Sequence, residues 1–426
     1  MFRGENAQSL AGLALVLGLC WLMSEDRRRF PWRLVLATVA VQALLILALF
    51  GVPALRAPLA LAGRAVDALA GSTQAGAAFV FGFLAGAPNQ PYPVADPAAL
   101  FIFGFRVLPV ILVVCALAAL LWHWRILRWL TEAFGFVFRR AFGLRGAPAL
   151  ATAATMFMGQ VEGPIFIRGY LASLSRSELF LLIAVGMSCV SGSTMVAYVA
   201  ILQGVLPNAA AHILTASIVS APAGVLLSRI VVPSDPAVEG GADQLPGAGK
   251  TYESSVDAVI KGTGDGLQIV LNVAATLIVF VAFTAMVDGL LAGLPPVGGA
   301  PVTLERGLGL LLAPLAWSLG VPWRDAPAAG GLLAIKLVLT EFSAFIHLGA
   351  MPAAELAHRT RVIMTYALCG FANIASVGIN VAGYNVLVPE RRAEVISLVW
   401  KAMATGFLAT CFSAAIVGAL PAAVVG

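Results

Sequence analysis

The sequence predicts an all-α polytopic membrane protein with about eight transmembrane helices, two re-entrant helical hairpins in an inverted repeat, and interfacial helices. Composition gives the first reason: of 426 residues, 60% are hydrophobic and only 11% are charged, with a mean hydropathy of +0.94. Soluble domains carry about 25% charged residues. The second reason is that long apolar runs recur along the chain. The third is that four apolar stretches, two in each half, are interrupted by polar residues.

Basic residues gather in short segments between the apolar runs, which is the pattern of cytoplasmic loops. The clusters are Arg27–Arg29 with Arg33, then Arg125, Arg128, Arg139, Arg140 and Arg145, and finally Arg391 with Arg392. This pattern predicts a multi-pass protein of the cell inner (cytoplasmic) membrane with both termini outside. It also favours membrane topology over a nucleic-acid partner as the source of the net charge of +5. The five cysteines form no CxxC pair, so no zinc or disulfide framework is expected.

Residues 1–121 are predicted to form peripheral N-terminal spans, with three transmembrane helices near 10–23, 34–52 and 101–121. The first run is followed by Ser24-Glu25-Asp26 and arginines rather than a small-residue cleavage site, which favours a retained span over a signal peptide. The stretch 53–100 is mixed in composition, punctuated by glycine and proline and short of charge, and its role is left open apart from a predicted interfacial patch at 77–85. Residues 122–145 alternate aromatics with arginines, which is typical of an interfacial amphipathic helix.

Residues 146–232 break the pattern of simple spans. The apolar stretch 149–170 is interrupted by Gly159–Pro164, and each flank of about ten residues is too short to cross a bilayer. Irregular backbone at membrane depth requires protein or a wet cavity around it, so a re-entrant hairpin fits best. A broken span follows at 178–203, interrupted at Ser188–Thr194, and a further span at 212–232 leads to a cytoplasmic connector, 233–265.

The same order recurs in the second half. Residues 266–326 are predicted to hold a long scaffold and oligomerisation span followed by an irregular external segment. Residues 327–426 then hold a second hairpin split at Thr340–Ser343, a span broken at Cys369–Ser376, and a last span. By the loop charges, the two hairpins enter from opposite sides. Paired interruptions in oppositely oriented halves indicate the binding site of a transporter.

One carboxylate lies at each hairpin break: Glu162 in the first and Glu341 in the second. An ionised carboxylate at bilayer depth costs about 2.5–3.5 kcal/mol even on insertion scales. Each is therefore expected to face a cavity and to meet a ligand or a cation. The alternative interpretation is a structural hydrogen bond, or an ion pair with Arg168 or Lys336.

Neutral polar residues share these breaks. Gln160 stands beside the first glutamate, and Asn373 and Ser376 lie in the second broken span together with the aromatic Phe371. Alone, each would be an ordinary packing residue. Their concentration suits a solute with several hydroxyl and N–H donors, and the absence of an arginine cluster argues against an anionic substrate.

Four motifs, in order along the chain, resemble the concentrative nucleoside transporters. Residues 159–168, GQVEGPIFIR, resemble the GQTEAPLLIRPY signature of that family, and 334–342, AIKLVLTEF, are similar to its KLVLNEF hairpin. Residues 366–373, YALCGFAN, match a further signature, and 105–109, FRVLP, resemble its third span. The resemblance implies a homotrimer with eight spans per protomer that moves nucleosides across the bilayer by an elevator motion.

The resemblance also implies a substrate site. It consists of Gln160, Val161, Glu162, Thr194, Glu341, Phe371, Asn373 and Ser376. The glutamine and glutamate of the first hairpin would hydrogen-bond the nucleobase. The glutamate, asparagine and serine of the second half would hold the ribose hydroxyls, and the phenylalanine would pack on the solute. Valine 161 stands where the signature has threonine, and threonine 194 where a small apolar residue is common, so the preference for purine or pyrimidine is left open.

The coupling ion is predicted from the same resemblance. The equivalents of the family's sodium ligands are Thr155, Met158, Cys189 and Val190. Thr155 replaces an asparagine and Cys189 replaces a serine, while the other two offer main-chain carbonyls. Sodium prefers oxygen ligands, and a thiol is a poor substitute. We therefore favour H⁺ coupling, with Glu162 or Glu341 as the carrier, over Na⁺, and expect no cofactor.

Two other functions are compatible with some of these residues. A transporter of nucleobases or of another polar solute on the same scaffold would need no ribose-binding residues. An intramembrane enzyme using the paired carboxylates is disfavoured because the HExxH, GxSxG and P-loop patterns are absent. The prediction is a transporter and not an enzyme.

Overall fold

The computed structural model describes residues 4–421, apart from positions 52, 88–101, 145, 166, 235–251, 297, 298, 300 and 353. Most of the predicted cytoplasmic connector therefore lies outside the described residues. Within the described ranges, all regular secondary structure is helical, which confirms the all-α prediction. Five stretches in these ranges are long and apolar enough to cross a membrane: Trp32–Phe50, Ala68–Ala85, Phe103–His123, Ala209–Val231 and Pro389–Ala419.

The N-terminal region contains one more long helix than the sequence indicated. Its elements are α1 (Gly4–Leu22), α2 (Trp32–Gly51), α3 (Pro53–Phe81), η1 (Gly82–Ala85), α4 (Phe103–Arg106) and α5 (Leu108–His123). Helix α3 occupies most of the stretch 53–100, for which the sequence predicted only an interfacial patch. Its many alanines are the best helix formers, and Pro53 is its first residue, a position where the missing N–H is not needed. The predicted amphipathic helix is found as α6 (Ile126–Phe142).

The first half has the predicted order of hairpin, broken span and span. Its elements are α7 (Gly146–Met158), α8 (Glu162–Ile165), η3 (Arg168–Ser173), α9 (Arg176–Ser188), α10 (Gly192–Leu202) and α11 (Ala209–Val231). The hairpin is asymmetric, since α8 is a single turn. Its reversal uses Gly159 at φ 125°, a conformation open to glycine and strained for other residues. Helix α10 restarts after the break because the Ser191 side chain caps it by accepting from the Thr194 N–H.

The second half repeats this order. Its elements are α12 (Ser255–Leu291), α13 (Leu304–Ser318), α14 (Ala326–Val338), α15 (Glu341–Ala350), α16 (His358–Leu368), α17 (Ile374–Leu387), η4 (Pro389–Arg391) and α18 (Arg392–Ala419). Helix α13 lies where an irregular external segment was predicted. It starts at a Thr303 cap and packs closely on α14, where a Cβ at Gly330 would come within 2.2 Å of the Gly309 carbonyl oxygen.

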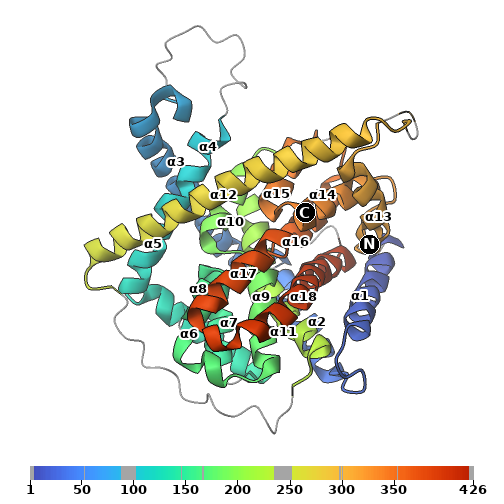
Figure 1. The fold of residues 1–426 in the computed structure, drawn as a ribbon, viewed down its shortest axis with the longest axis horizontal. Helices are drawn as coiled ribbons and strands as arrows, with labels where there is room; N and C mark the ends of the chain where they lie inside the picture. Colours follow the sequence, from blue (N-terminus) through green and yellow to red (C-terminus); the bar gives the residue numbers. More distant parts are fainter. Residues whose placement is uncertain are drawn as a thin grey trace.

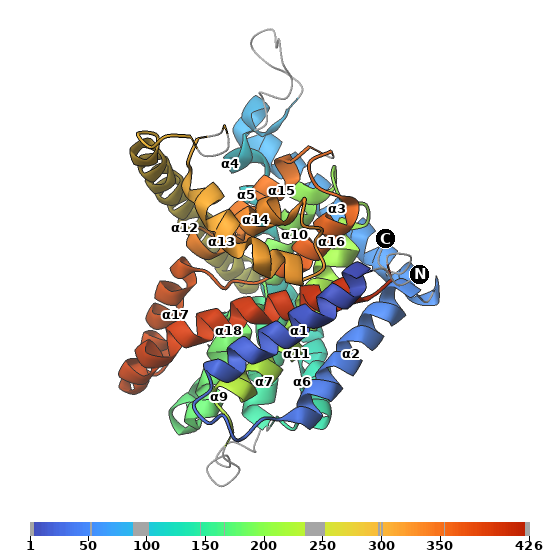
Figure 2. The same cartoon turned by 90° about the vertical axis from the view of Figure 1, so that its right-hand side faces the viewer.

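Helices α18, α11 and α9 form the centre of the molecule, and α1 lies along α18 (Figures 1 and 2). The two chain ends meet there, because the Asn6 side chain donates to the carbonyl oxygens of Gly418 and Leu420 at 3.1 and 2.9 Å. Helix α12 crosses one face obliquely. It packs on α5 through Gly262 and Gly266, small residues that allow the two backbones to approach closely.

A charged cluster ties together several of the loops that the sequence placed in the cytoplasm. Arg176 and Lys401 both donate to the Glu25 carboxylate, each at 3.0 Å. The hydrogen bond from Arg176 holds the pKa of Glu25 below its ordinary value. Arg391 donates to the Leu171 carbonyl oxygen at 3.0 Å. The ends of α1, η3, α9 and α18 therefore lie on one side of the protein.

Candidate functional site

The interruptions of the two broken spans meet in the interior. The Phe371 N–H donates to the Cys189 carbonyl oxygen at 3.2 Å, which joins the α16/α17 break to the α9/α10 break. A Cβ at Gly370 would be 2.9 Å from the Ser188 carbonyl oxygen, so glycine permits this approach. The tip of the first hairpin also reaches the α9/α10 break, since a Cβ at Gly192 would be 3.2 Å from the Phe157 carbonyl oxygen.

Glu341 is the first residue of α15 and is only 5% exposed. Thr340 caps the helix by accepting from the Ser343 N–H. The Tyr198 hydroxyl donates to Glu341 Oε1 at 2.8 Å, and the Asn373 Nδ2 donates to Oε2 at 2.8 Å. Neither of the predicted ion-pair partners bonds to Glu341: Lys336 bonds to Ala367 and Thr410, and Arg168 donates to the Val386 carbonyl oxygen. Both carboxylate oxygens accept from neutral groups.

The orientation of the Asn373 amide follows from its position as the cap of α17. Its Oδ1 accepts from the Ser376 N–H at 2.8 Å, satisfying one of the free donors at the start of that helix. The backbone N–H can only donate, so Oδ1 must face it and Nδ2 must face Glu341. The helix cap therefore requires Glu341 Oε2 to act as an acceptor.

Gln160 connects the first hairpin to the same network. Its Nε2 donates to Ser376 Oγ at 3.2 Å, and its Oε1 accepts from Asn380 Nδ2 at 2.9 Å. Asn380 Nδ2 also donates to the Ser376 carbonyl oxygen. The structure thus brings Gln160, Glu341, Asn373 and Ser376 together in one buried chain of hydrogen bonds that runs from one hairpin to the other.

Two members of this network were missed by sequence reasoning, Tyr198 and Asn380. Tyr198 lies in an apolar run and reads as a core residue, but it follows Thr194 by four positions and so shares its helix face. Asn380 follows Asn373 by seven positions, two turns of α17. A search for polar residues at helical spacing from each break would have found both.

The remaining predicted substrate residues lie at the same breaks. Thr194 is buried and its hydroxyl donates to the Ser191 carbonyl oxygen at 3.0 Å. Val161 packs closely against the backbone of α17 at Gly383. Phe371 is half-buried beside the α9/α10 break. Glu162 begins α8, and its side chain lies outside the part of the chain that is described.

The predicted ion residues lie in two places, on α7 and at the α9/α10 break. Thr155 is buried and its hydroxyl donates to the Ala151 carbonyl oxygen at 2.8 Å, while Met158 is the last residue of α7. Cys189 and Val190 are linked through Ser217 of α11. The thiol of Cys189 is 3.9 Å from the Ser217 carbonyl oxygen, and the Ser217 hydroxyl donates to the Val190 carbonyl oxygen at 3.4 Å.

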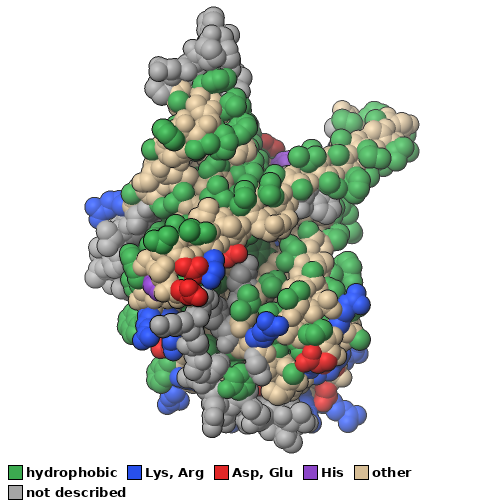
Figure 3. Space-filling model, turned by 60° about the vertical axis from the view of Figure 1, so that its left-hand side comes forward, with side chains coloured by type: hydrophobic (Ala, Val, Ile, Leu, Met, Phe, Trp, Pro, Cys, Tyr) green, Lys and Arg blue, Asp and Glu red, His purple; other side chains and the backbone are tan. Residues whose placement is uncertain are grey.

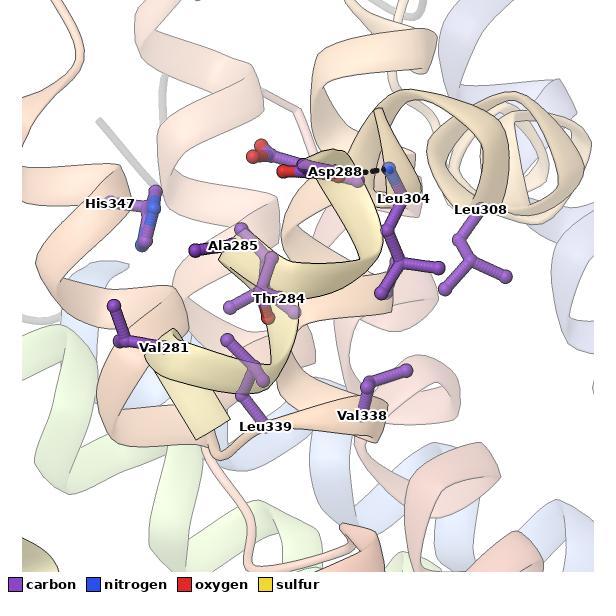
Figure 4. Close-up of a pocket in the computed structure, with 12 residues that line it drawn as sticks. Val281, Thr284, Ala285, Asp288, Leu304, Leu308, Val338, Leu339 and His347 are labelled. Carbon is purple, nitrogen blue, oxygen red and sulfur yellow. Dashed lines mark hydrogen bonds between the residues drawn. The ribbon is translucent and has the colours of Figure 1, made fainter. Parts of the chain in front are cut away.

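A cavity of about 300 Å³ lies on the other side of the second hairpin, between α12, α13 and α14 (Figure 4). Its walls are mainly apolar, including Val281, Leu304 and Leu339, and Asp288 and His347 also line it. None of the predicted substrate residues lines this cavity. It separates part of the second hairpin from α12, the long oblique helix.

Three family models match this chain. The model described as the Na⁺ dependent nucleoside transporter C-terminus matches residues 212–418, and that for the N-terminus matches 11–84. A third, named Gate and described as nucleoside recognition, matches 104–204. The match over 104–204 contains the first hairpin and the first broken span. The match over 212–418 contains the second hairpin and the second broken span.

Full-length relatives and solved structures agree with these matches. The chain is 32% identical over 417 residues to the nucleoside permease NupC of Helicobacter pylori, covering 96% of each protein. It is 34% identical over 411 residues to the uncharacterized transporter YutK of Bacillus subtilis, covering 96% of this chain and 98% of that protein. The structure of CNTnw in an inward-facing substrate-bound state is 32% identical and superposes with a TM-score of 0.86, covering 98% of this chain and 99% of that one.

An outward-facing variant of CNTnw superposes with a TM-score of 0.85 at 31% identity, covering 98% of each chain. These relatives are transporters and not enzymes, which confirms both the prediction of a polytopic membrane transporter and the resemblance carried by the four motifs. The chain is an integral membrane protein that belongs to the concentrative nucleoside transporter family.

Proposed function

We propose that this protein takes up nucleosides across the cytoplasmic membrane by cation-coupled secondary active transport, with H⁺ as the coupling ion. The observation that carries the proposal is the buried hydrogen-bond chain from Gln160 to Glu341. It joins two hairpins that lie far apart in the sequence, and ionisable residues within membrane segments typically mark the pathway of a solute or an ion. The relative named above as a nucleoside permease supports this substrate class.

The polar groups of the site match the two parts of a nucleoside. Glu341 offers two carboxylate oxygens, which suit the adjacent hydroxyls of a ribose, with Asn373 and Ser376 beside it. Gln160 offers both a donor and an acceptor, as the edge of a nucleobase requires. We assign the base to Gln160 and Glu162.

Three further residues shape the base side of the site. Phe371 would pack on the ring of the base, and Val161 and Thr194 would set the choice of base. The Val161 side chain is apolar. The Thr194 hydroxyl already donates to the Ser191 carbonyl oxygen in the α9/α10 break.

The residues at the predicted ion site support H⁺ over Na⁺. Sodium requires several oxygen ligands, but Cys189 supplies sulfur at one of the predicted ligand positions. Glu162 and Glu341 are the candidate proton carriers.

Uptake into proteoliposomes tests substrate and ion together. We expect uridine and adenosine to accumulate when an inward proton gradient is imposed, and a sodium gradient at constant pH to add little. Liposomes with a collapsed gradient are the control. Uptake that requires sodium and ignores pH contradicts H⁺ coupling. Equal uptake of uracil and uridine contradicts the ribose roles of Glu341 and Asn373 and favours a nucleobase transporter.

Tyr198→Phe is expected to weaken uridine binding about tenfold, because the hydroxyl that orients Glu341 is worth about 1–1.5 kcal/mol. The ring is retained, and so is its stacking on Phe345, with ring centroids 4.4 Å apart. Tyr384→Phe is the matched control, since the Tyr384 hydroxyl is buried with no hydrogen-bond partner among the described residues. Equilibrium binding to purified protein distinguishes the two variants; equal affinities would remove Tyr198 from the site.

We also propose a homotrimer that works by an elevator motion. Helix α12 carries an exposed apolar face that suits burial against neighbouring copies (Figure 3). The face includes Ile260, Leu267, Leu271, Ile278, Phe283, Met286 and Leu290. The cavity between α12 and the second hairpin leaves room for the hairpin to slide past this scaffold. By the loop charges, both termini face outward.

A further inference from the structure

Asp325 is a buried carboxylate that the proposed solute site does not use. It lies just before α14, at the end of that helix remote from Glu341. Its Oδ2 accepts from the Ala357 N–H at 3.0 Å and from the Thr360 hydroxyl at 2.7 Å, and both of these residues belong to the start of α16. A carboxylate satisfies free N–H groups at a helix N-terminus and is favoured there by the helix dipole. The start of α14 is therefore fixed to the start of α16.

Arg361 makes the corresponding link between α15 and α16. It lies in the first turn of α16 and is 3% exposed. Its Nη1 donates to the Leu348 carbonyl oxygen at 3.1 Å, and its Nη2 donates to the carbonyl oxygens of Met351, at 2.9 Å, and Pro352. These carbonyls lie at the end of α15, where a helix leaves unpaired acceptors and the negative end of its dipole. The guanidinium therefore holds the end of α15 against the start of α16.

The opposite ends of the same helices carry the proposed solute site. Glu341 is the first residue of α15, and Asn373, which donates to it, follows the end of α16. Lys336 of α14 bonds to the Ala367 carbonyl oxygen in the last turn of α16. The three helices pack against one another (Figures 1 and 2), and α15, with 10 residues, is nearly as long as α16, with 11. Because α14 and α15 are each linked to α16 at both ends, the links at the remote ends help to set where Glu341 lies relative to Asn373.

The first hairpin is held in a different way. The carbonyl oxygens of Leu171 and Leu174, which follow it, accept from Arg391 at 3.0 and 2.6 Å, and that arginine belongs to the second half of the chain. Loss of a link between α15 and α16 should therefore displace Glu341 and leave the first hairpin, to which we assign the base, in place.

We propose that Asp325 and Arg361 are positioning residues for the recognition of the ribose. They hold the second hairpin against α16, so that the Glu341 carboxylate is aimed at the hydroxyls of the solute. Each lies at the far end of a helix of at least ten residues, about 15 Å, and so acts through that helix rather than by touching the solute. The inference rests on the proposed function, because it builds on the ribose roles of Glu341 and Asn373.

The test compares the affinities of purified, full-length protein for uridine and for dideoxyuridine, which has the same base but lacks the two neighbouring hydroxyls of the ribose ring. Wild type should prefer uridine, because only those hydroxyls can donate to Glu341. We expect Arg361→Gln to bind uridine about tenfold more weakly, which corresponds to the loss of one well-placed hydrogen bond, and to bind dideoxyuridine as wild type does. A variant that is merely less stable loses sites for both compounds alike, so the ratio of the two dissociation constants isolates positioning.

Glu355→Gln is the matched control, because Glu355 is exposed in the loop between α15 and α16. It should keep the wild-type ratio. An unchanged ratio in Arg361→Gln, including equal losses for the two compounds, overturns the inference. Wild-type protein that binds the two compounds equally overturns the ribose assignment of the proposed function instead, so the two failures are distinct.

If Arg361→Gln protein does not fold, Thr360→Val decides the matter. This substitution keeps the shape of the side chain and removes one of the two hydrogen bonds to Asp325 Oδ2, while the Ala357 N–H still donates. We expect uridine affinity to fall about threefold, less than for Arg361→Gln because one donor remains, with dideoxyuridine affinity unchanged. In a Glu341→Gln background the same substitution should leave the ratio unaltered, since the carboxylate that it positions is gone. Thr360→Val protein with the wild-type ratio contradicts the inference.

Discussion

Glu341→Gln is expected to abolish high-affinity nucleoside uptake while leaving insertion into the membrane intact. The substitution keeps the size of the side chain but replaces one acceptor oxygen with a donor. Asn373 presents a fixed N–H donor to one side of residue 341, so the new amide must turn its own donor toward Tyr198 and the solute. Charged hydrogen bonds are worth about 1.5–3 kcal/mol each, so the loss of two ribose contacts weakens binding by more than about a hundredfold.

Glu355→Gln is the matched control for this variant, because Glu355 is exposed in the loop after the second hairpin. Initial rates of radiolabelled uridine uptake, normalised to the amount of protein in the membrane fraction, measure the effect. Wild-type uptake by Glu341→Gln protein would show that the carboxylate has only a structural role.

The positions of the breaks could be predicted because a polar residue within an apolar run has few physical explanations. Glycine and proline at Gly159–Pro164, and the polar stretch at Thr340–Ser343, lie in runs too short to cross on either side. Both became hairpins. The helices α3 and α13 were missed for the opposite reason. Their glycines and prolines suggested loops. In α3 the many alanines favour a helix despite these residues, and α13 is stabilised by its close packing on α14.

The site itself was only partly predictable. Gln160, Glu341, Asn373 and Ser376 were each found from their place in a break, and the structure joins them. Which group bonds to which depends on how α10 and α17 pack, and this is absent from the sequence. Tyr198 illustrates the difficulty, because its ring belongs to the apolar core while its hydroxyl reaches Glu341.

Lys336 shows the same limit in another form. The sequence places a cation five residues from Glu341 and so suggests an ion pair, but the ammonium bonds to Ala367 and Thr410 instead. The Ala367 carbonyl oxygen at the end of α16 is available to Lys336 because the Phe371 N–H donates to the Cys189 carbonyl oxygen of the first half. A pairing between Cys189 and Phe371, about 180 residues apart, can be recognised only once the two halves are folded together.

Gly370→Ala is expected to destabilise the protein by about 3 kcal/mol, at the upper end of what overpacking usually costs, and to eliminate uptake. The added methyl would lie 2.9 Å from the Ser188 carbonyl oxygen and 2.6 Å from the Thr410 methyl group. The first contact is with backbone and cannot be relieved by a rotamer change. The α16/α17 break must therefore move away from the α9/α10 break, which breaks the hydrogen bond from Phe371 to Cys189.

The loss of uptake follows from the position of this contact. Asn373 caps α17 only three residues later, so a displacement of the break also displaces this cap. The Asn373 amide would then no longer orient Glu341 toward the residues of the first hairpin. Thr410 also holds Lys336. Gly18→Ala is the matched control, because its methyl would meet no atom within 4 Å. Thermal unfolding in detergent should separate the two variants by several degrees; equal stability and uptake would mean that the two breaks do not pack as tightly as this geometry requires.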